Sequence, residues 1–143
     1  MKNKLFTIIT VMFMVLLLSG CGKKVTYLNC VHTQDKTVLD YNVKFVGKTV
    51  EEMDIKLDMD VSEYNDTQIE AIGKQDYCAV LASSMPQYKD ALDNCKQNIV
   101  EKHLVVTSDL LVDKVASSEK EKMGSIEETK KAIEATGYTC TTK

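Results

Sequence analysis

Two consecutive stretches of alternating apolar and polar residues, separated by Gly47, constrain this chain more than any other feature. The stretches 38–46 and 50–61 place an apolar side chain at almost every second position. A period of two is typical of a β-strand with one buried face and one solvated face. A glycine between two such stretches indicates a turn, so we expect an antiparallel hairpin.

The pairing register of this hairpin follows from its side chains. A two-residue turn would bring the apolar face of the first strand against acidic residues of the second. A three-residue turn, 47–49, sets Val43 opposite Met53 and Leu39 opposite Leu57. Because a slip of one residue would expose an entire apolar face, we expect the second register, through the longer turn or a bulge.

Capping residues indicate two helices further along the chain. Ser62 or Thr67 is expected to cap the first, Thr67 with Glu70 as a capping box, and this helix should end before Pro86. Ser125 and Glu128 have the spacing of a capping box and should begin the second. Gly137 then suits the position just after the end of that helix, called C′.

The remaining segments complete an α+β plan. We expect a first strand at 25–33, a loop or helical turn at 87–94, a second hairpin at 95–100 and 103–113, a polar connector at 116–124, and a closing strand at 138–142. The order is β-β-β-α-β-β-α-β, which predicts an antiparallel sheet with helices on one face.

The first twenty residues have the parts of a secretory signal. Lys2 and Lys4 precede an apolar run over 5–18, and two small residues follow it. A helix of about 14 residues spans roughly 21 Å, which is too short for a hydrocarbon core of about 30 Å. A permanent transmembrane helix is therefore the weaker interpretation.

Residues 18–21, Leu-Ser-Gly-Cys, resemble the lipobox of bacterial lipoproteins. The resemblance implies diacylglyceryl transfer to the Cys21 sulfur and cleavage after Gly20. Residues 1–20 would then be the signal peptide, 21–24 a lipidated tether and 25–143 a single extracytoplasmic domain. Acyl chains such as palmitate would hold it on the outer face of the cell membrane. The alternative is an ordinary signal peptide with a chance cysteine.

Composition narrows the class of partner. Without Lys2 and Lys4 the chain keeps 16 lysines against 21 acidic residues, a formal charge of −5, and it has no arginine. Because arginine is the usual reader of phosphate and guanine, a nucleic-acid partner is disfavoured. The acidic balance would also repel anionic headgroups, so we expect the acyl anchor to do all the membrane binding. The all-lysine composition favours a low-GC, Gram-positive source.

Four cysteines remain besides the lipobox cysteine. An even number in an exported chain indicates two disulfides, with free buried thiols as the alternative. Cys30 with Cys140 is favoured because the terminal strands can pair as neighbours, and Cys78 with Cys95 because the chain around Pro86 can fold back on the helix. The two other connectivities would tie the helix to the terminal strands.

The motifs of catalysis and metal binding are missing or incomplete. Residues 58–62 resemble the opening of an EF-hand loop, but Glu63 stands where glycine is needed and Ile69 where glutamate is needed. His32 and His103 lack the spacing of metal ligands, and no Cys-x-x-Cys occurs. We therefore predict no catalytic, cofactor or metal site.

The whole pattern resembles the small YehR-type lipoproteins of low-GC Gram-positive bacteria. The features shared are the lipobox, the hairpin around Gly47, the strand at 104–106 and the ending 133–140. The resemblance implies the fold and the anchor. It offers no site residues, because that family is itself uncharacterised.

These features favour a non-enzymatic surface module. Its ligand would be a peptide, a cell-wall component or a small apolar molecule. The alternative is an accessory subunit of a membrane complex such as a transporter. An enzyme is disfavoured because no nucleophile or acid–base pair stands out.

The lipobox leads to the first testable prediction. Cys21→Ala removes the only thiol that can accept diacylglyceryl at this position, so the full-length precursor should accumulate and take up no labelled fatty acid. Metabolic labelling of cells that express the two forms measures this. Normal labelling of the variant would refute the lipoprotein assignment.

Overall fold

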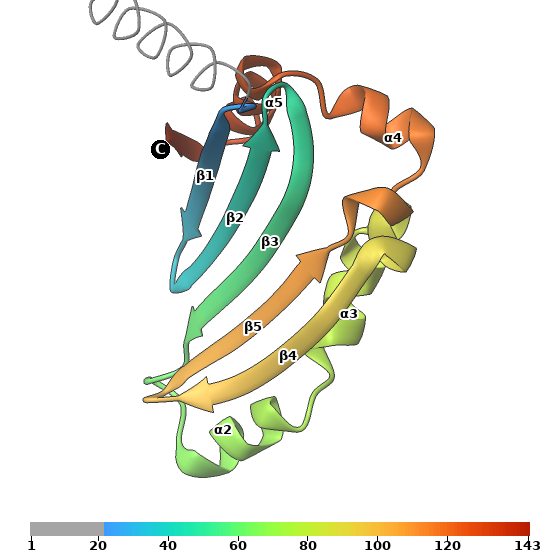
Figure 1. The fold of residues 1–143 in the computed structure, drawn as a ribbon. Helices are drawn as coiled ribbons and strands as arrows, with labels where there is room; N and C mark the ends of the chain where they lie inside the picture. The colour runs from blue at the N-terminus through green and yellow to red at the C-terminus, as the bar shows by residue number, and fades with distance from the viewer. Residues whose placement is uncertain (1–21) are drawn as a thin grey trace, which may run out of the picture.

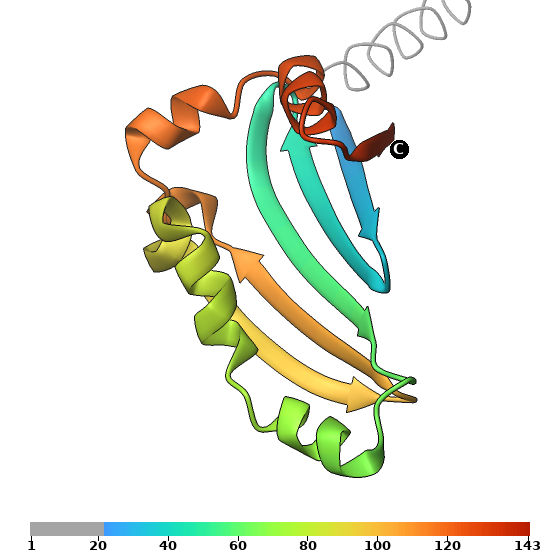
Figure 2. The same cartoon turned by 180° about the vertical axis from the view of Figure 1, so that it is seen from behind.

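The computed structural model describes residues 22–143, so the predicted signal peptide and Cys21 lie outside the described part. The described chain forms one twisted antiparallel sheet with helices on one face (Figures 1 and 2). Its six strands are β1 (Val25–Gln34), β2 (Thr37–Val46), β3 (Thr49–Asp60), β4 (Leu92–Val100), β5 (His103–Leu110) and β6 (Thr139–Thr142). The α+β class and the placement of helices on one face are confirmed.

The strand order is β4-β5-β3-β2-β1-β6. The meander β1–β2–β3 forms the middle of the sheet. The hairpin β4–β5 extends it beside β3, and β6 returns from the end of the chain to pair with β1. β6 thereby places the C-terminal strand beside the first strand, at one edge of the sheet.

The β2–β3 register is the predicted one, with Val43 opposite Met53. The turn has only two residues, 47–48, and the first is a glycine with φ 65°. A bulge between Lys44 and Phe45 shifts the register by one residue. Of the two solutions expected for this hairpin, the bulge is therefore the one that the chain adopts.

The prediction of one helix from Ser62 or Thr67 to Pro86 is wrong. Two helices occupy this stretch, α2 (Asp66–Gly73) and α3 (Tyr77–Ser84). Asn65 caps α2 through a capping box with Gln68, whose side chain bonds back to the Asn65 amide. An amide pair does here what the expected Thr67–Glu70 pair would have done.

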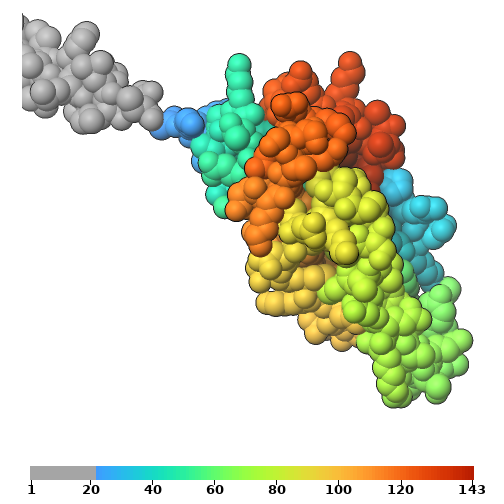
Figure 3. Space-filling view, turned by 90° about the vertical axis from the view of Figure 1, so that its right-hand side faces the viewer, coloured from blue at the N-terminus to red at the C-terminus, as the bar shows by residue number. Residues whose placement is uncertain are grey.

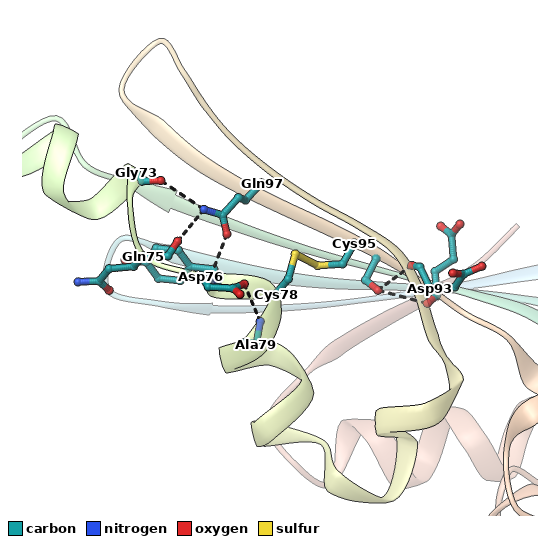
Figure 4. The surroundings of a disulfide bond; sticks show 11 residues. Gly73, Gln75, Asp76, Cys78, Ala79, Asp93, Cys95 and Gln97 are labelled. Carbon is teal, nitrogen blue, oxygen red and sulfur yellow. Dashed lines mark hydrogen bonds between the residues drawn. A yellow bond between two sulfur atoms is a disulfide. The ribbon is translucent and has the colours of Figure 1, made fainter.

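The break between α2 and α3 is held by a side chain from β4 (Figure 4). Gln97 Nε2 donates to the carbonyl of Gln75 at 2.6 Å, and Gln97 Oε1 accepts from the Tyr77 amide at 2.8 Å. Asp76 then accepts from the Ala79 amide and begins α3. The hydrogen bonds of Gln97 hold the segment between the two helices, and the Asp76 side chain caps the N-terminus of α3.

The other helical segments also differ in part from expectation. They are η1 (Pro86–Ala91), η2 (Val112–Lys114), α4 (Ser117–Lys122) and α5 (Ile126–Glu134). The predicted polar connector thus contains α4. The predicted second hairpin is present as β4 and β5, but β4 begins before residue 95 and β5 ends at Leu110 rather than at 113.

α5 begins as predicted, since Ser125 and Glu128 form the capping box. The helix ends at the C-cap Ala135, which puts Gly137 one residue beyond the predicted C′ position. The glycine is still needed there because its φ is 93°.

The core lies between the sheet and the helices, in three clusters. Near α5 it contains Leu28, Cys30, Val43, Phe45, Val50 and Cys140. Near α2 and α3 it contains Val61, Leu104 and Val106. A third cluster beneath η1 and η2 contains Ala91, Leu110 and Val115.

Both disulfides have the favoured connectivity. Cys30 and Cys140 are directly opposite each other in β1 and β6, with Cα atoms 4.0 Å apart. Cys78 and Cys95 join α3 to β4, with Cα atoms 5.9 Å apart (Figure 4). One disulfide therefore fastens the final strand, and the other fastens a helix to the opposite edge of the sheet.

The sequence separations predict unequal stabilisation. On the chain-entropy view, a 110-residue loop contributes about 5 kcal/mol and a 17-residue loop about 3 kcal/mol. The double substitution C30S/C140S should therefore lower the free energy of unfolding more than C78S/C95S does. Urea denaturation of both variants measures this, and an equal or reversed order would contradict it.

Candidate functional site

A cavity of about 460 Å³ lies between α5 and the helix-covered face of β2 and β3. Most of its exposed lining is apolar. Its walls come from the sheet, from η1 and the residue before it, from the end of α4, from α5 and from the residue before β6. They are Tyr41, Met53, Met85, Gln87, Tyr88, Lys122, Met123, Thr129, Ala132, Ile133, Thr136 and Tyr138.

The sheet side of the cavity follows directly from the hairpin register. Tyr41 and Met53 belong to the alternating apolar positions of β2 and β3, which face the helices. The opposite wall is the apolar side of α5, including Ile133. The cavity lies between these two apolar surfaces, where their side chains do not fill the space completely.

Three methionines line the cavity: Met53, Met85 and Met123. A methionine side chain has three rotatable bonds and a polarisable sulfur, so it adapts to ligands of different shape. Met85 and Met123 lie outside regular strands, next to η1 and α4. The walls that they form are therefore the most adaptable ones.

An aromatic row connects the cavity to the edge of the sheet. The rings of Tyr41 and Tyr138 have centroids 5.4 Å apart, and those of Tyr138 and His32 are 5.0 Å apart. His32 Nδ1 lies 3.0 Å from the carbonyl oxygen of Gly137. That contact requires a proton on Nδ1, which donates it to the carbonyl. His32 thus positions the Tyr138 wall.

Burial raises the pKa of the Tyr41 hydroxyl well above its ordinary value, and Tyr138 adds to the shift. The pKa of Tyr88 is also raised, by burial and by the negative charge of Glu119. At neutral pH both tyrosines are uncharged. They contribute a ring surface and a hydroxyl to the cavity.

Two polar side chains of the cavity lining are paired within the protein. Lys122 Nζ is 2.7 Å from Glu119 Oε1, and this partner raises the pKa of Lys122. The buried Thr129 hydroxyl donates to the main-chain carbonyl of Met123. Among the residues that line this cavity, no nucleophile is paired with a general base.

The histidines are not brought together. His32 belongs to the aromatic row, whereas His103 Nδ1 lies 2.7 Å from Asp58 Oδ1 near the other end of the sheet. In the EF-hand-like segment, Asp60 accepts from the Ser62 amide, as in a turn. Within residues 22–143 there is no group of three or more His, Cys, Asp or Glu residues placed to hold a metal ion.

The sequence pattern did not reveal this cavity. Tyr88 and Met123 lie in the segments predicted as a loop and a polar connector. The available signal was the presence of these large apolar side chains outside periodic elements. Such residues in otherwise polar connections often fold back over an apolar surface.

No protein-family profile and no curated protein matches the chain. Among solved structures, the NMR structure of the YehR protein of E. coli is similar, with a TM-score of 0.54 at 13% identity over 83% of this chain and 92% of that one. The chain has a YehR-like fold. An NMR structure of a protein from Streptococcus pneumoniae TIGR4 gives a TM-score of 0.47 at 14% identity, over 82% of this chain and 86% of that one.

No helix among residues 22–143 has the length and apolar character that a membrane crossing requires.

The raised pKa of Tyr41 predicts a dependence of stability on pH. The folded state keeps this proton when the unfolded chain, with a tyrosine pKa of about 10, releases it. Stability should therefore fall as pH rises above about 10, and less steeply in Tyr41→Phe. Urea denaturation between about pH 9 and pH 11 measures the slope. The exposed Tyr64→Phe is the control, and an unchanged slope in Tyr41→Phe would contradict the assignment.

Proposed function

We propose that this chain is the precursor of a lipoprotein anchored to the outer face of the cell membrane through Cys21. Its domain binds a small apolar ligand, without catalysis, in the cavity between α5 and the sheet. The observation that carries the binding function is the cavity itself. Its volume of about 460 Å³ is within the range of small-molecule sites, roughly 300–1,000 Å³.

The lining supports an apolar ligand. Methionine and tyrosine side chains offer polarisable surface, and the charged group at the rim, Lys122, is neutralised by Glu119. A ligand with a buried charge would find no unpaired counter-charge in the lining. An apolar or weakly polar molecule loses little by entering.

Two features support export and anchoring. The first is the resemblance of residues 18–21 to the lipobox. The second is the pair of disulfides, Cys30–Cys140 and Cys78–Cys95, because such bonds persist in oxidising compartments. Both are compatible with a domain that works outside the cytoplasm.

A matched pair of substitutions on α5 and its C-cap tests the binding function. Ala132 lines the cavity, whereas Ala135 does not. Ala132→Phe should fill the cavity and weaken binding of an uncharged apolar fluorescent probe, N-phenyl-1-naphthylamine, by about tenfold, which corresponds to about 1.4 kcal/mol. Titration of the purified protein with the probe, followed by fluorescence, measures the dissociation constants.

Ala135→Phe adds the same ring outside the cavity and should leave probe binding unchanged. Equal affinities for Ala132→Phe and the unsubstituted protein would refute the cavity as the binding site. Crosslinking in intact cells gives an independent reading, because an accessory subunit would be recovered with one membrane protein in fixed ratio.

A further inference from the structure

Lys23 and Lys24, which directly precede β1, contact the β2–β3 turn. The Gly47 amide donates to the carbonyl oxygen of Lys24 at 2.8 Å, and the methylene groups of Lys23 lie beside Gly47. Residues 22–24 can span at most about 11 Å. The length of this segment therefore keeps the β2–β3 turn close to the proposed lipid anchor.

Around this attachment lies a surface with both cationic and apolar side chains, here called the hairpin-end surface. It comprises Lys23, Lys24, Val25, Tyr27 and Lys48. The three lysines are exposed, and none forms an ion pair with a carboxylate of residues 22–143. Val25 is 47% exposed and Tyr27 40% exposed, although both are large apolar residues.

Val25 and Tyr27 lie on the face of the sheet that the helices leave open. Val25 is directly opposite Val46 in β2, and Tyr27 is directly opposite Lys44. Lys44 Nζ lies 2.9 Å from Glu52 Oε1, and this ion pair neutralises the charge of Glu52. Glu51 is a further exposed carboxylate next to the turn, and exposed Glu121 lines the same depression as Lys48, beside the exposed Lys120.

The opposite end of the molecule has the opposite charge. Figure 3 shows an elongated shape, with the start of β1 at one end and α2 at the other. Asp60 ends β3 and Asp66 begins α2, whereas Glu63 between them is paired with Lys36 at 2.6 Å. A formal charge of −5 for residues 21–143 therefore conceals a cationic end next to the anchor.

We propose that the hairpin-end surface lies against the headgroups of an anionic phospholipid bilayer, so that the sheet stands on the membrane by its β2–β3 turn. This inference rests on the anchor proposed above. It replaces the expectation that the acyl chains do all the membrane binding. The lysines contact anionic headgroups, and Tyr27 lies at the level where amphipathic rings partition. The acidic α2 end is held away from the membrane.

The physical basis is the short range of surface electrostatics. Each lysine close to an anionic surface strengthens binding by about fivefold, and the effect disappears beyond a Debye length of about 8 Å at physiological salt. Only charges near the anchor are close enough to contribute. The acidic residues at the far end therefore do not cancel the contribution of Lys23, Lys24 and Lys48.

The absence of tryptophan from the whole sequence allows a clean measurement of orientation. Tyr27→Trp and Tyr64→Trp introduce one reporter each, at residues that are 40% and 45% exposed, at opposite ends of the molecule. The processed full chain is purified from membranes, its mass establishes whether Cys21 carries lipid, and it is reconstituted into vesicles of brominated phosphatidylcholine and phosphatidylglycerol. We expect bromine to quench the tryptophan fluorescence of the Tyr27→Trp protein and to leave that of the Tyr64→Trp protein unchanged.

A charge-reversal pair tests the contribution of the lysines. In the Tyr27→Trp background, K23E/K48E should abolish the quenching, whereas K89E/K96E, the same change at exposed lysines elsewhere, should preserve it. A mass without lipid would overturn the anchor and this inference together. Lipidated protein with equal quenching at both positions, or quenching indifferent to K23E/K48E, would overturn the orientation alone.

Discussion

The pairing of β2 with β3 determines the orientation of almost every other element. β1 takes its register from β2, β5 takes its register from β3, and β4 and β6 add to those outer strands. Apolar pairs such as Val43 with Met53 set the helix-covered face of the central hairpin. Because side chains alternate between faces, the bulge at Lys44 and Phe45 is what allows a short turn and a continuous apolar face to coexist.

The hairpin was predictable because both of its determinants are local. The alternation around Gly47 defines the faces, and the cost of exposing an apolar face defines the register. The helices were less predictable. Asn65 with Gln68 forms the capping box by amide groups, and the break before Tyr77 depends on Gln97, which lies 20 residues away in sequence. A contact of this kind has no local pattern.

The cavity was not predictable for a related reason. It forms where segments without periodicity, around Tyr88 and Met123, fold back over the sheet beside α5. Local sequence shows that these side chains are apolar but not which surface they will cover. The cysteine pairing, in contrast, followed from topology, because Cys30 and Cys140 belong to strands whose order along the chain favours an edge pairing.

The pairing of β6 with β1 joins the first and last strands of the domain, and this affects the order in which the molecule can be completed. A ribosome releases Cys30 long before Cys140, so the sheet keeps an open edge at β1 until the final residues emerge. Tyr138 lies immediately before β6 and forms part of the cavity wall. The cavity is consequently completed by the last few residues of the chain, and a nascent or C-terminally shortened domain contains the floor of the cavity without its closing wall.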